Sequence, residues 1–137
     1  EADSLDAVVT IDVVEHLNKG EHILLVDAIY RTLKSGGRWI VHTPNGNSPF
    51  CGAVRYGDYT HEQAFTPVSM YQLLKSSGFE RVLFSESGPI IHGCVSFIRY
   101  IIWQGFRFIY ILAEGAETGE LFGEKILTRN FYTVAIK

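Results

Sequence analysis

The sequence lacks the glycine-rich turn that opens a nucleotide-binding sheet. No two of its 13 glycines are separated by a single residue, so the G-x-G-x-x-G pattern does not occur. Cysteine is also scarce: Cys51 and Cys94 stand alone, which excludes a disulfide framework and a paired-cysteine zinc site and indicates a reducing cytoplasm. The net charge is −3 and lysines and arginines do not cluster, so a nucleic-acid partner is not expected.

The remaining composition is that of a soluble globular chain. Its 137 residues suffice for one domain, with 47% hydrophobic and 20% charged residues. One long apolar stretch, residues 92–113, carries Arg99, Gln104 and Arg107, which makes it a poor membrane span. Its polar side chains recur at helical spacing and share one stripe, so the stretch predicts an amphipathic helix. We expect this helix to pack on the sheet; the alternative is an interfacial helix that touches a lipid-linked substrate.

Strand-like and helix-like patterns alternate along the chain. Strands are predicted over residues 5–11, 38–43, 81–85 and 131–136, and helices over residues 20–33, 67–77 and 92–113. Gly36 and Gly37 are expected to end the first helix, whereas Thr66 and Pro67 begin the second. Two loops are predicted, a long polar one over residues 44–66 and one rich in glycine and glutamate over residues 115–124. This order predicts an α/β fold with a mainly parallel sheet and helices on both faces.

The run LDAVVTIDVVEHL, residues 5–17, is the most informative stretch. Its apolar first half predicts a buried strand. Asp12, Glu15 and His16 follow at spacings i, i+3 and i+4, which places them on one face if the chain turns helical there. Polar side chains just past the carboxyl end of a buried strand lie where open α/β sheets bind ligands. His61, in the polar loop, is a further candidate because two carboxylates lie near it in the sequence.

Four short motifs follow one another in a fixed order. They are IDVVEHL at residues 11–17, LKSGG at 33–37, TPN at 43–45, and a spaced block of His61, FTP at 65–67, Ser69, LL at 73–74 and GF at 78–79. This order resembles the C-terminal half of a class I S-adenosylmethionine-dependent methyltransferase of the type 11/23 kind. The segment after TPN and the apolar helix resemble methyltransferases of bacterial surface-polysaccharide clusters.

The resemblance implies a fold. It is a partial Rossmann-like sheet with strands 4-5-7-6 of the family order, mostly parallel, with the last strand of the chain antiparallel between two others. Residues 1–137 would form a single half-domain, into which the loop 44–66 and the helix 92–113 are inserted.

The same resemblance implies a reaction. S-adenosylmethionine is the expected cofactor, and Ile11 and Asp12 would line its pocket through backbone and apolar contacts. The expected reaction is methylation of a hydroxyl group of a sugar or another small acceptor. His16 and His61 are then candidate general bases, because histidine titrates near neutral pH, and Glu15 is a third catalytic candidate beside them.

Alternative interpretations exist for these side chains. Two carboxylates and two imidazoles also suit a divalent metal, as in the small-RNA 2′-O-methyltransferases of the family; the candidate ligands are Asp12, Glu15, His16 and His61. Such a metal would lower the pKa of an acceptor hydroxyl. The simpler interpretation is that Asp12 caps a helix and Glu15 favours its positive end. Two further histidines, His22 and His42, are expected to be structural.

The loop residues have two interpretations as well. Either they recognise a sugar acceptor or they form an exposed polar loop; the residues concerned are Arg55, Tyr56, Asp58 and Tyr59.

The absence of the glycine turn predicts that this chain alone binds the cofactor weakly and is inactive. The strand that would neighbour residues 5–11 is absent too, so Leu5–Ile11 is expected to present a bare edge. Either the chain is a fragment, or this edge pairs with a second copy in a homodimer. A non-catalytic interaction module that works through the same edge is the competing class of function.

Overall fold

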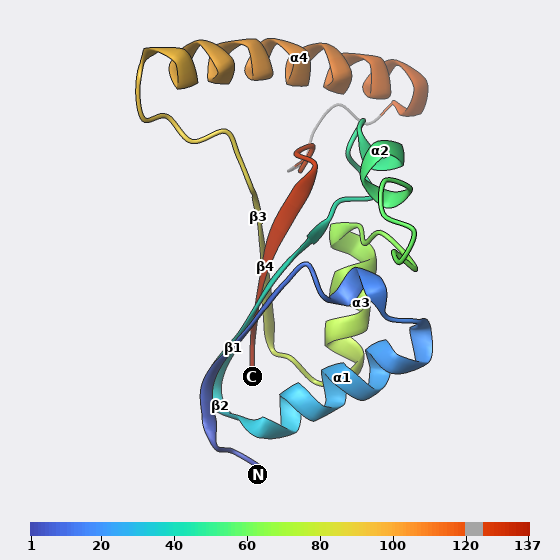
Figure 1. The fold of residues 1–137 in the computed structure, drawn as a ribbon, viewed down its shortest axis with the longest axis vertical. Helices are drawn as coiled ribbons and strands as arrows, with labels where there is room; N and C mark the ends of the chain where they lie inside the picture. Colours follow the sequence, from blue (N-terminus) through green and yellow to red (C-terminus); the bar gives the residue numbers. More distant parts are fainter. Residues whose placement is uncertain (120–124) are drawn as a thin grey trace.

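The computed structural model describes residues 1–119 and 125–137. Strands and helices alternate along the chain (Figure 1). In order they are β1 (Leu5–Ile11), the short 3-10 helix η1 (Val14–His16), α1 (Lys19–Thr32), β2 (Leu33–Pro44), α2 (Cys51–Arg55), α3 (Pro67–Ser76), β3 (Arg81–Glu86), α4 (Cys94–Thr118) and β4 (Asn130–Ile136).

The four strands form one sheet in the order β1-β2-β4-β3. The pairing of β1 with β2 is parallel, and β4 runs antiparallel to both β2 and β3. Three strands therefore point one way, and the last strand of the chain is inserted between two of them in the opposite direction. This confirms the mixed α/β sheet and the position expected for the antiparallel strand.

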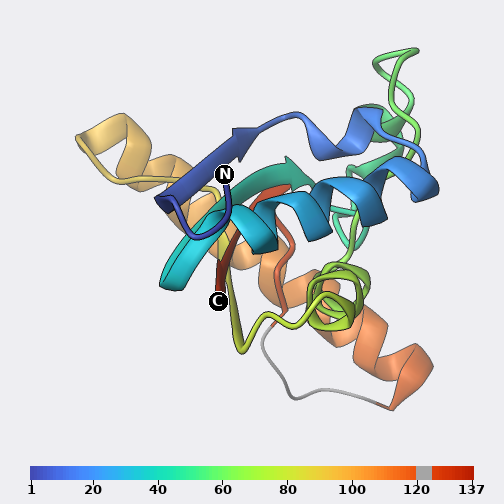
Figure 2. The same ribbon diagram turned by 90° about the horizontal axis from the view of Figure 1, so that it is seen from below.

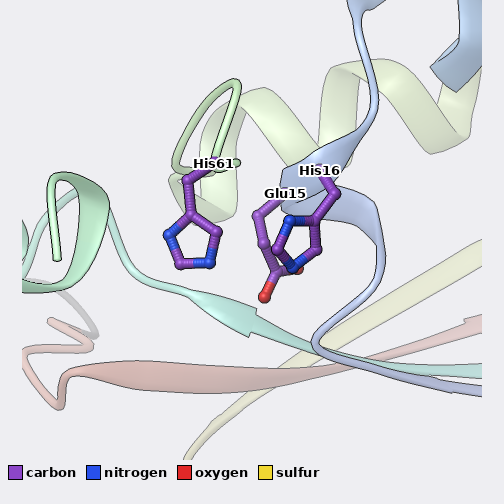
Figure 3. Close-up of side chains that lie close together, drawn as sticks. All are labelled: Glu15, His16 and His61. Atoms are coloured by element: carbon purple, nitrogen blue, oxygen red, sulfur yellow. The ribbon is translucent and has the colours of Figure 1, made fainter. Parts of the chain in front are cut away.

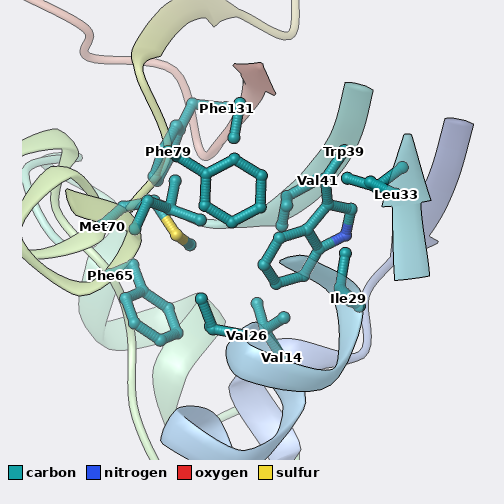
Figure 4. Close-up of a cluster of buried hydrophobic side chains, with 12 residues drawn as sticks. Val14, Val26, Ile29, Leu33, Trp39, Val41, Phe65, Met70, Phe79 and Phe131 are labelled. Carbon is teal, nitrogen blue, oxygen red and sulfur yellow. The ribbon is translucent and has the colours of Figure 1, made fainter. Parts of the chain in front are cut away.

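The hydrophobic core lies on one face of this sheet (Figure 4). Trp39 on β2 and Phe131 on β4 point into it, and α1 and α3 cover it with Val26 and Leu74. Strand residues alternate between the two faces, so their neighbours in sequence point to the other side. On that other side large apolar side chains remain exposed: Val9, Ile11, Leu83 and Tyr132.

Two expectations about the sheet are therefore wrong. Within the described residues, helices α1 and α3 cover the same face, as Figure 1 shows, and the opposite face is not covered by a helix. The strand Leu5–Ile11 is not buried either, because in the described part of the chain it pairs with β2 alone and leaves one edge and one face open. Its apolar composition correctly indicated a strand, but it did not indicate that the side chains of this strand are largely exposed.

Capping side chains explain where α1 and α3 begin. Asn18 accepts hydrogen bonds from the backbone N–H groups of Gly20 and Glu21, and Thr66 accepts one from Ser69, so both helices start with a capping box. Helix α3 therefore begins as predicted, with Pro67 at its first position.

The predicted glycine stop of the first helix is wrong. Leu33 is already extended, so α1 ends before the glycines, and Gly36 adopts φ 76° inside β2. There its N–H donates to the carbonyl of Lys137 (2.8 Å), so pairing with the end of the chain determines the conformation of this segment. The loop 44–66 also contains the short helix α2, which the sequence did not indicate.

Helix α4 differs most from expectation. It begins two residues later than predicted and continues to Thr118, inside the segment expected to be a loop; residues 120–124 of that segment lie outside the described residues. Only Ser96 and Gly115 of α4 are buried. The helix lies across the end of the sheet and extends past it on both sides (Figures 1 and 2). The prediction that it packs on the sheet is wrong.

Candidate functional site

Glu15, His16 and His61 meet at the carboxyl ends of β1 and β2 (Figure 3). The carboxylate and ring nitrogen atoms of these three residues lie within 4.8 Å of one another. The two imidazole rings contact each other edge to face, with their centroids 4.8 Å apart. Residues 45 positions apart in the sequence thus form one polar cluster at the edge where parallel strands end.

The turn after β1 determines how the first two of these residues point. Asp12 adopts φ 52°, a left-handed conformation that aspartate tolerates better than most residues, and this reverses the chain at the strand end. A single 3-10 turn follows and is not continued, because Leu17 is extended. Glu15 is buried at 1% exposure, whereas His16 lies nearer the surface beside Thr60. The expected α-helical face does not form.

The surroundings of His61 fix its protonation pattern. Its Nδ1 lies 3.0 Å from the carbonyl oxygen of Val54, which can only accept, so Nδ1 carries the hydrogen. In the neutral imidazole the lone pair then lies on the other ring nitrogen, Nε2. The guanidinium of Arg55 donates to the backbone carbonyls of His61 and Glu62, so one arginine on α2 holds the segment that bears the imidazole.

His16 has the same pattern through different partners. Its Nδ1 faces the carbonyl oxygen of Thr60 at 3.3 Å and the hydroxyl oxygen of that residue at 2.9 Å. The Thr60 hydroxyl gives its single hydrogen to Asp58 (2.7 Å), so Nδ1 of His16 is the donor. These hydrogen bonds from Thr60 hold the pKa of the Asp58 carboxyl below its ordinary value, and the nearby His61 and His16 act in the same direction.

Glu15 links the cluster to the core of the sheet. Its carboxylate accepts a hydrogen bond from the hydroxyl of Thr43 (3.2 Å) at the end of β2. Its backbone carbonyl accepts from the N–H groups of Glu62 and Gln63, at 2.8 and 3.2 Å. The loop that carries His61 is therefore attached directly to the turn that carries His16.

The remaining predicted site residues lie apart from this cluster. Asp12 accepts a hydrogen bond from Nδ1 of His42 (2.8 Å), and no side-chain hydrogen bond caps η1, so the helix-cap interpretation of Asp12 is wrong. Of the four candidate metal ligands, Asp12 is outside the group that the structure brings together. Ile11 is 60% exposed on the open face of the sheet.

The loop residues divide into two kinds. Tyr56 and Tyr59 are strongly exposed, whereas Arg55 and Asp58 hold the two histidines in place. The sequence did not indicate these positioning roles or that of Thr60, because they depend on contacts between residues that only the fold brings together. The only signal was the density of polar residues around His61. His22 is buried, with Nε2 2.6 Å from the carbonyl of Val14, in agreement with a structural role.

The fold of this chain is similar to that of known proteins, although its sequence is not. No protein-family profile and no curated protein matches the chain. Solved structures do match. A methyltransferase dependent on S-adenosylmethionine, from Archaeoglobus fulgidus, has a TM-score of 0.65 at 20% identity, over 99% of this chain and 61% of its own.

Two further methyltransferases give the same result. One is from Thermotoga maritima and is named as a possible histamine N-methyltransferase, with a TM-score of 0.61 at 16% identity, over 100% of this chain and 58% of its own. The other is from Mesorhizobium loti, with a TM-score of 0.57 at 14% identity, over 100% of this chain and 64% of its own. This chain thus spans about three fifths of the length of these proteins. Its four strands and their helices have the fold of class I S-adenosylmethionine-dependent methyltransferases.

Proposed function

We propose that this chain carries the acceptor side of an S-adenosylmethionine-dependent methyltransferase that acts on a hydroxyl group, such as one of a sugar or glycan. The observation that supports the proposal most is the pair His16 and His61, each with Nδ1 engaged and Nε2 open. Such a pair suits proton removal from a hydroxyl better than binding alone, so we favour an enzyme over a non-catalytic interaction module. We also propose that the protein is located in the cytoplasm.

His61 is the better placed general base. Its ring is held by the carbonyl of Val54 and its backbone by Arg55, so the direction of the Nε2 lone pair is fixed. A proton taken up at Nε2 makes the ring an imidazolium. The carboxylate of Glu15 lies within 4.8 Å and offsets this charge in a partly buried place. His16 contacts the same ring edge to face and lies beside Glu15 (Figure 3).

The described residues fit one wall of the cofactor site. The exposed side chain of Ile11 provides an apolar surface beside the turn at Asp12. The sequence contains no glycine-rich turn that could form the other wall. The chemistry that bound S-adenosylmethionine supplies is an electrophilic methyl group, which must lie in line with the acceptor oxygen. We expect the isolated 137-residue chain to bind the cofactor more weakly than micromolar in calorimetry.

The test of the proposal is the substitution His61→Gln. Methyl transfer to a panel of sugar and other small hydroxyl acceptors is measured with the product of the full reading frame that encodes these residues. We expect kcat to fall by about 10²–10⁴-fold, with cofactor affinity unchanged, because the glutamine cannot take up the proton. The matched control is His92→Gln, at an exposed histidine before α4, which should leave kcat unchanged. Equal activity of His61→Gln and wild type would reject His61 as the base.

The same activity assay, repeated in the presence of EDTA, tests whether His61 acts as a general base or as a ligand of a divalent metal ion. Glu15, His16 and His61 offer one carboxylate and two imidazoles, which also suits a divalent ion, with both Nδ1 atoms held as metal-bound histidines require. If His61 acts as the base, EDTA should leave the activity unchanged. Loss of activity in EDTA and its recovery with Mn²⁺ would instead assign the three side chains to a metal.

A further inference from the structure

Helix α4 exposes an apolar surface that the described part of the chain does not cover. It is long and apolar enough to cross a membrane by length and composition, yet only 6% of its most apolar 18-residue window is buried. Its exposed large apolar side chains are Val95, Phe97, Ile98, Ile101, Ile102, Phe106, Phe108, Ile109 and Leu112. At about 100° per residue they cover roughly half of the helix circumference, and this half bears no charge. We call it the apolar half of α4.

The polar side of α4 is turned toward the protein. The guanidinium of Arg107 pairs with Glu86 at the end of β3, and Glu114 pairs with Lys125 (2.9 Å). Near the start of the helix Ser96 is buried and accepts a hydrogen bond from the N–H of His92 (2.8 Å). The two ion pairs attach this side of the helix to the rest of the protein, so most of the apolar half faces away from the domain. Phe106, at the border of that half, stacks on Phe50 with the ring centroids 5.7 Å apart. This is the reverse of a helix that covers a hydrophobic core.

The connections of α4 exclude a membrane span. The strand before it ends at Glu86 and the strand after it begins near Phe131, and these two residues pair with each other in the sheet. Both ends of α4 thus connect to the same end of one sheet. If α4 crossed a bilayer, the chain would have to return through the hydrocarbon between Thr118 and Asn130, and this stretch has too few residues for a second spanning helix. An apolar surface on this helix can meet lipid only with the helix in the plane of the membrane.

Two basic side chains without an ion-pair partner in the described part of the chain lie beside α4. The acidic residues of the helix, Glu114 and Glu117, lie in its last two turns, and no acidic residue occurs between Cys94 and Ala113. Arg99, at the border of the apolar half, and Arg129, before β4, line one cavity of about 550 Å³ next to the helix. Both are exposed, and neither has an ion-pair partner within residues 1–119 and 125–137. Two unpaired guanidinium groups beside an apolar surface match the phosphates and acyl chains of an anionic lipid layer.

We propose that α4 docks this protein on the surface of an anionic phospholipid membrane. The apolar half enters the boundary between headgroups and acyl chains, and Arg99 and Arg129 contact lipid phosphates. The width of the apolar half favours lipid over a second copy, because a helix that pairs with one partner helix needs only the narrow seam of a coiled coil. Protein interfaces normally have a polar rim around an apolar centre, whereas the apolar half of α4 lacks polar side chains. This difference also favours lipid over a protein partner.

The test is binding to vesicles. The 137-residue chain is sedimented with vesicles of phosphatidylcholine alone and of phosphatidylcholine with phosphatidylglycerol. We expect binding to the anionic vesicles and a loss of at least about tenfold in Ile102→Glu/Ile109→Glu, because burial of each isoleucine contributes a tenfold factor or more. Both positions are exposed, at 66% and 67%, so circular dichroism should show an unchanged fold. Arg99→Gln/Arg129→Gln should remove the preference for phosphatidylglycerol.

The matched control is Ile23→Glu/Leu24→Glu, at two apolar residues of α1 that are 54% and 70% exposed. It should bind vesicles like wild type. The proposal is overturned if wild type does not bind anionic vesicles or if both double variants lose binding equally. It is also overturned if wild type dimerises without lipid and Ile102→Glu/Ile109→Glu makes it a monomer. Neither measurement requires the cofactor, so the result is independent of the proposed methyl transfer.

Discussion

At the scale of single residues, the turn after β1 brings Glu15 and His16 beside His61. The spacing argument assumed an α-helix for this turn, whereas the chain makes one 3-10 turn. Asp12 explains the difference, because its left-handed backbone and its bond to His42 depend on the neighbouring strand β2. A pattern within one segment cannot indicate a conformation that a second segment stabilises.

The hydrogen bonds that Arg55 donates to the backbone around His61 can be tested by substitution. The substitution Arg55→Met removes the donors to the carbonyls of His61 and Glu62, so the imidazole should lose its fixed direction. We expect kcat to fall by about tenfold or more with KM for the acceptor little changed, since small misplacements of a catalytic group are costly. Arg55→Lys should recover part of kcat, because an ammonium can still donate to a carbonyl.

The control for Arg55 is Arg31→Met on α1. Arg31 also donates to a backbone carbonyl, that of Asp27 (3.3 Å), but far from the cluster in the fold. It should leave kcat unchanged. A parallel fall of kcat and of the unfolding temperature in Arg55→Met, without recovery by lysine, would show that Arg55 stabilises the fold and does not position His61.

At the scale of elements, the sequence predicted the kind of each segment more reliably than its orientation. The polar stripe on α4 was foreseen, but periodicity tells only which side chains share a face. Which face turns inward depends on Glu86 and Lys125, which belong to other segments. Gly36 is similar: glycine after a helical pattern usually marks a cap, but here pairing of β2 with the chain end decides its conformation.

The N-terminal cap of α1 allows a prediction of stability. Asn18 accepts hydrogen bonds from the N–H groups of Gly20 (2.9 Å) and Glu21 (3.1 Å), and these donors would otherwise lack partners in the helix. Asn18→Ala should therefore lower the free energy of unfolding by about 1 kcal/mol in urea titration. Asn47→Ala, at an exposed asparagine in the loop, is the control and should change it by less than about 0.5 kcal/mol. Equal effects of the two substitutions would contradict the capping role.

At the scale of the whole molecule, the strand order was predicted and the coverage of the sheet was not. The order β1-β2-β4-β3, with β4 antiparallel between two other strands, agrees with the order that the resemblance implied. The motifs could indicate this order because they follow one another along the chain. They could not indicate which face of the sheet the helices cover, because α1 and α3 each carry one apolar stripe that fits either face.

The open edge of β1 carries the last prediction. Among the described residues this strand pairs with β2 alone, and Val9 is 57% exposed, so the edge is free to pair with a second copy of the chain. If the chain forms this dimer, Val9→Lys should convert it to a monomer in sedimentation equilibrium, because a lysine on an edge strand disfavours pairing between edges. Leu83→Lys, at a 50% exposed residue on the same face but on the opposite edge strand β3, is the matched control and should leave the dimer intact. A wild-type chain that is monomeric at concentrations of about 100 μM, which correspond to a binding free energy near −5.5 kcal/mol, would exclude a dimer through this edge.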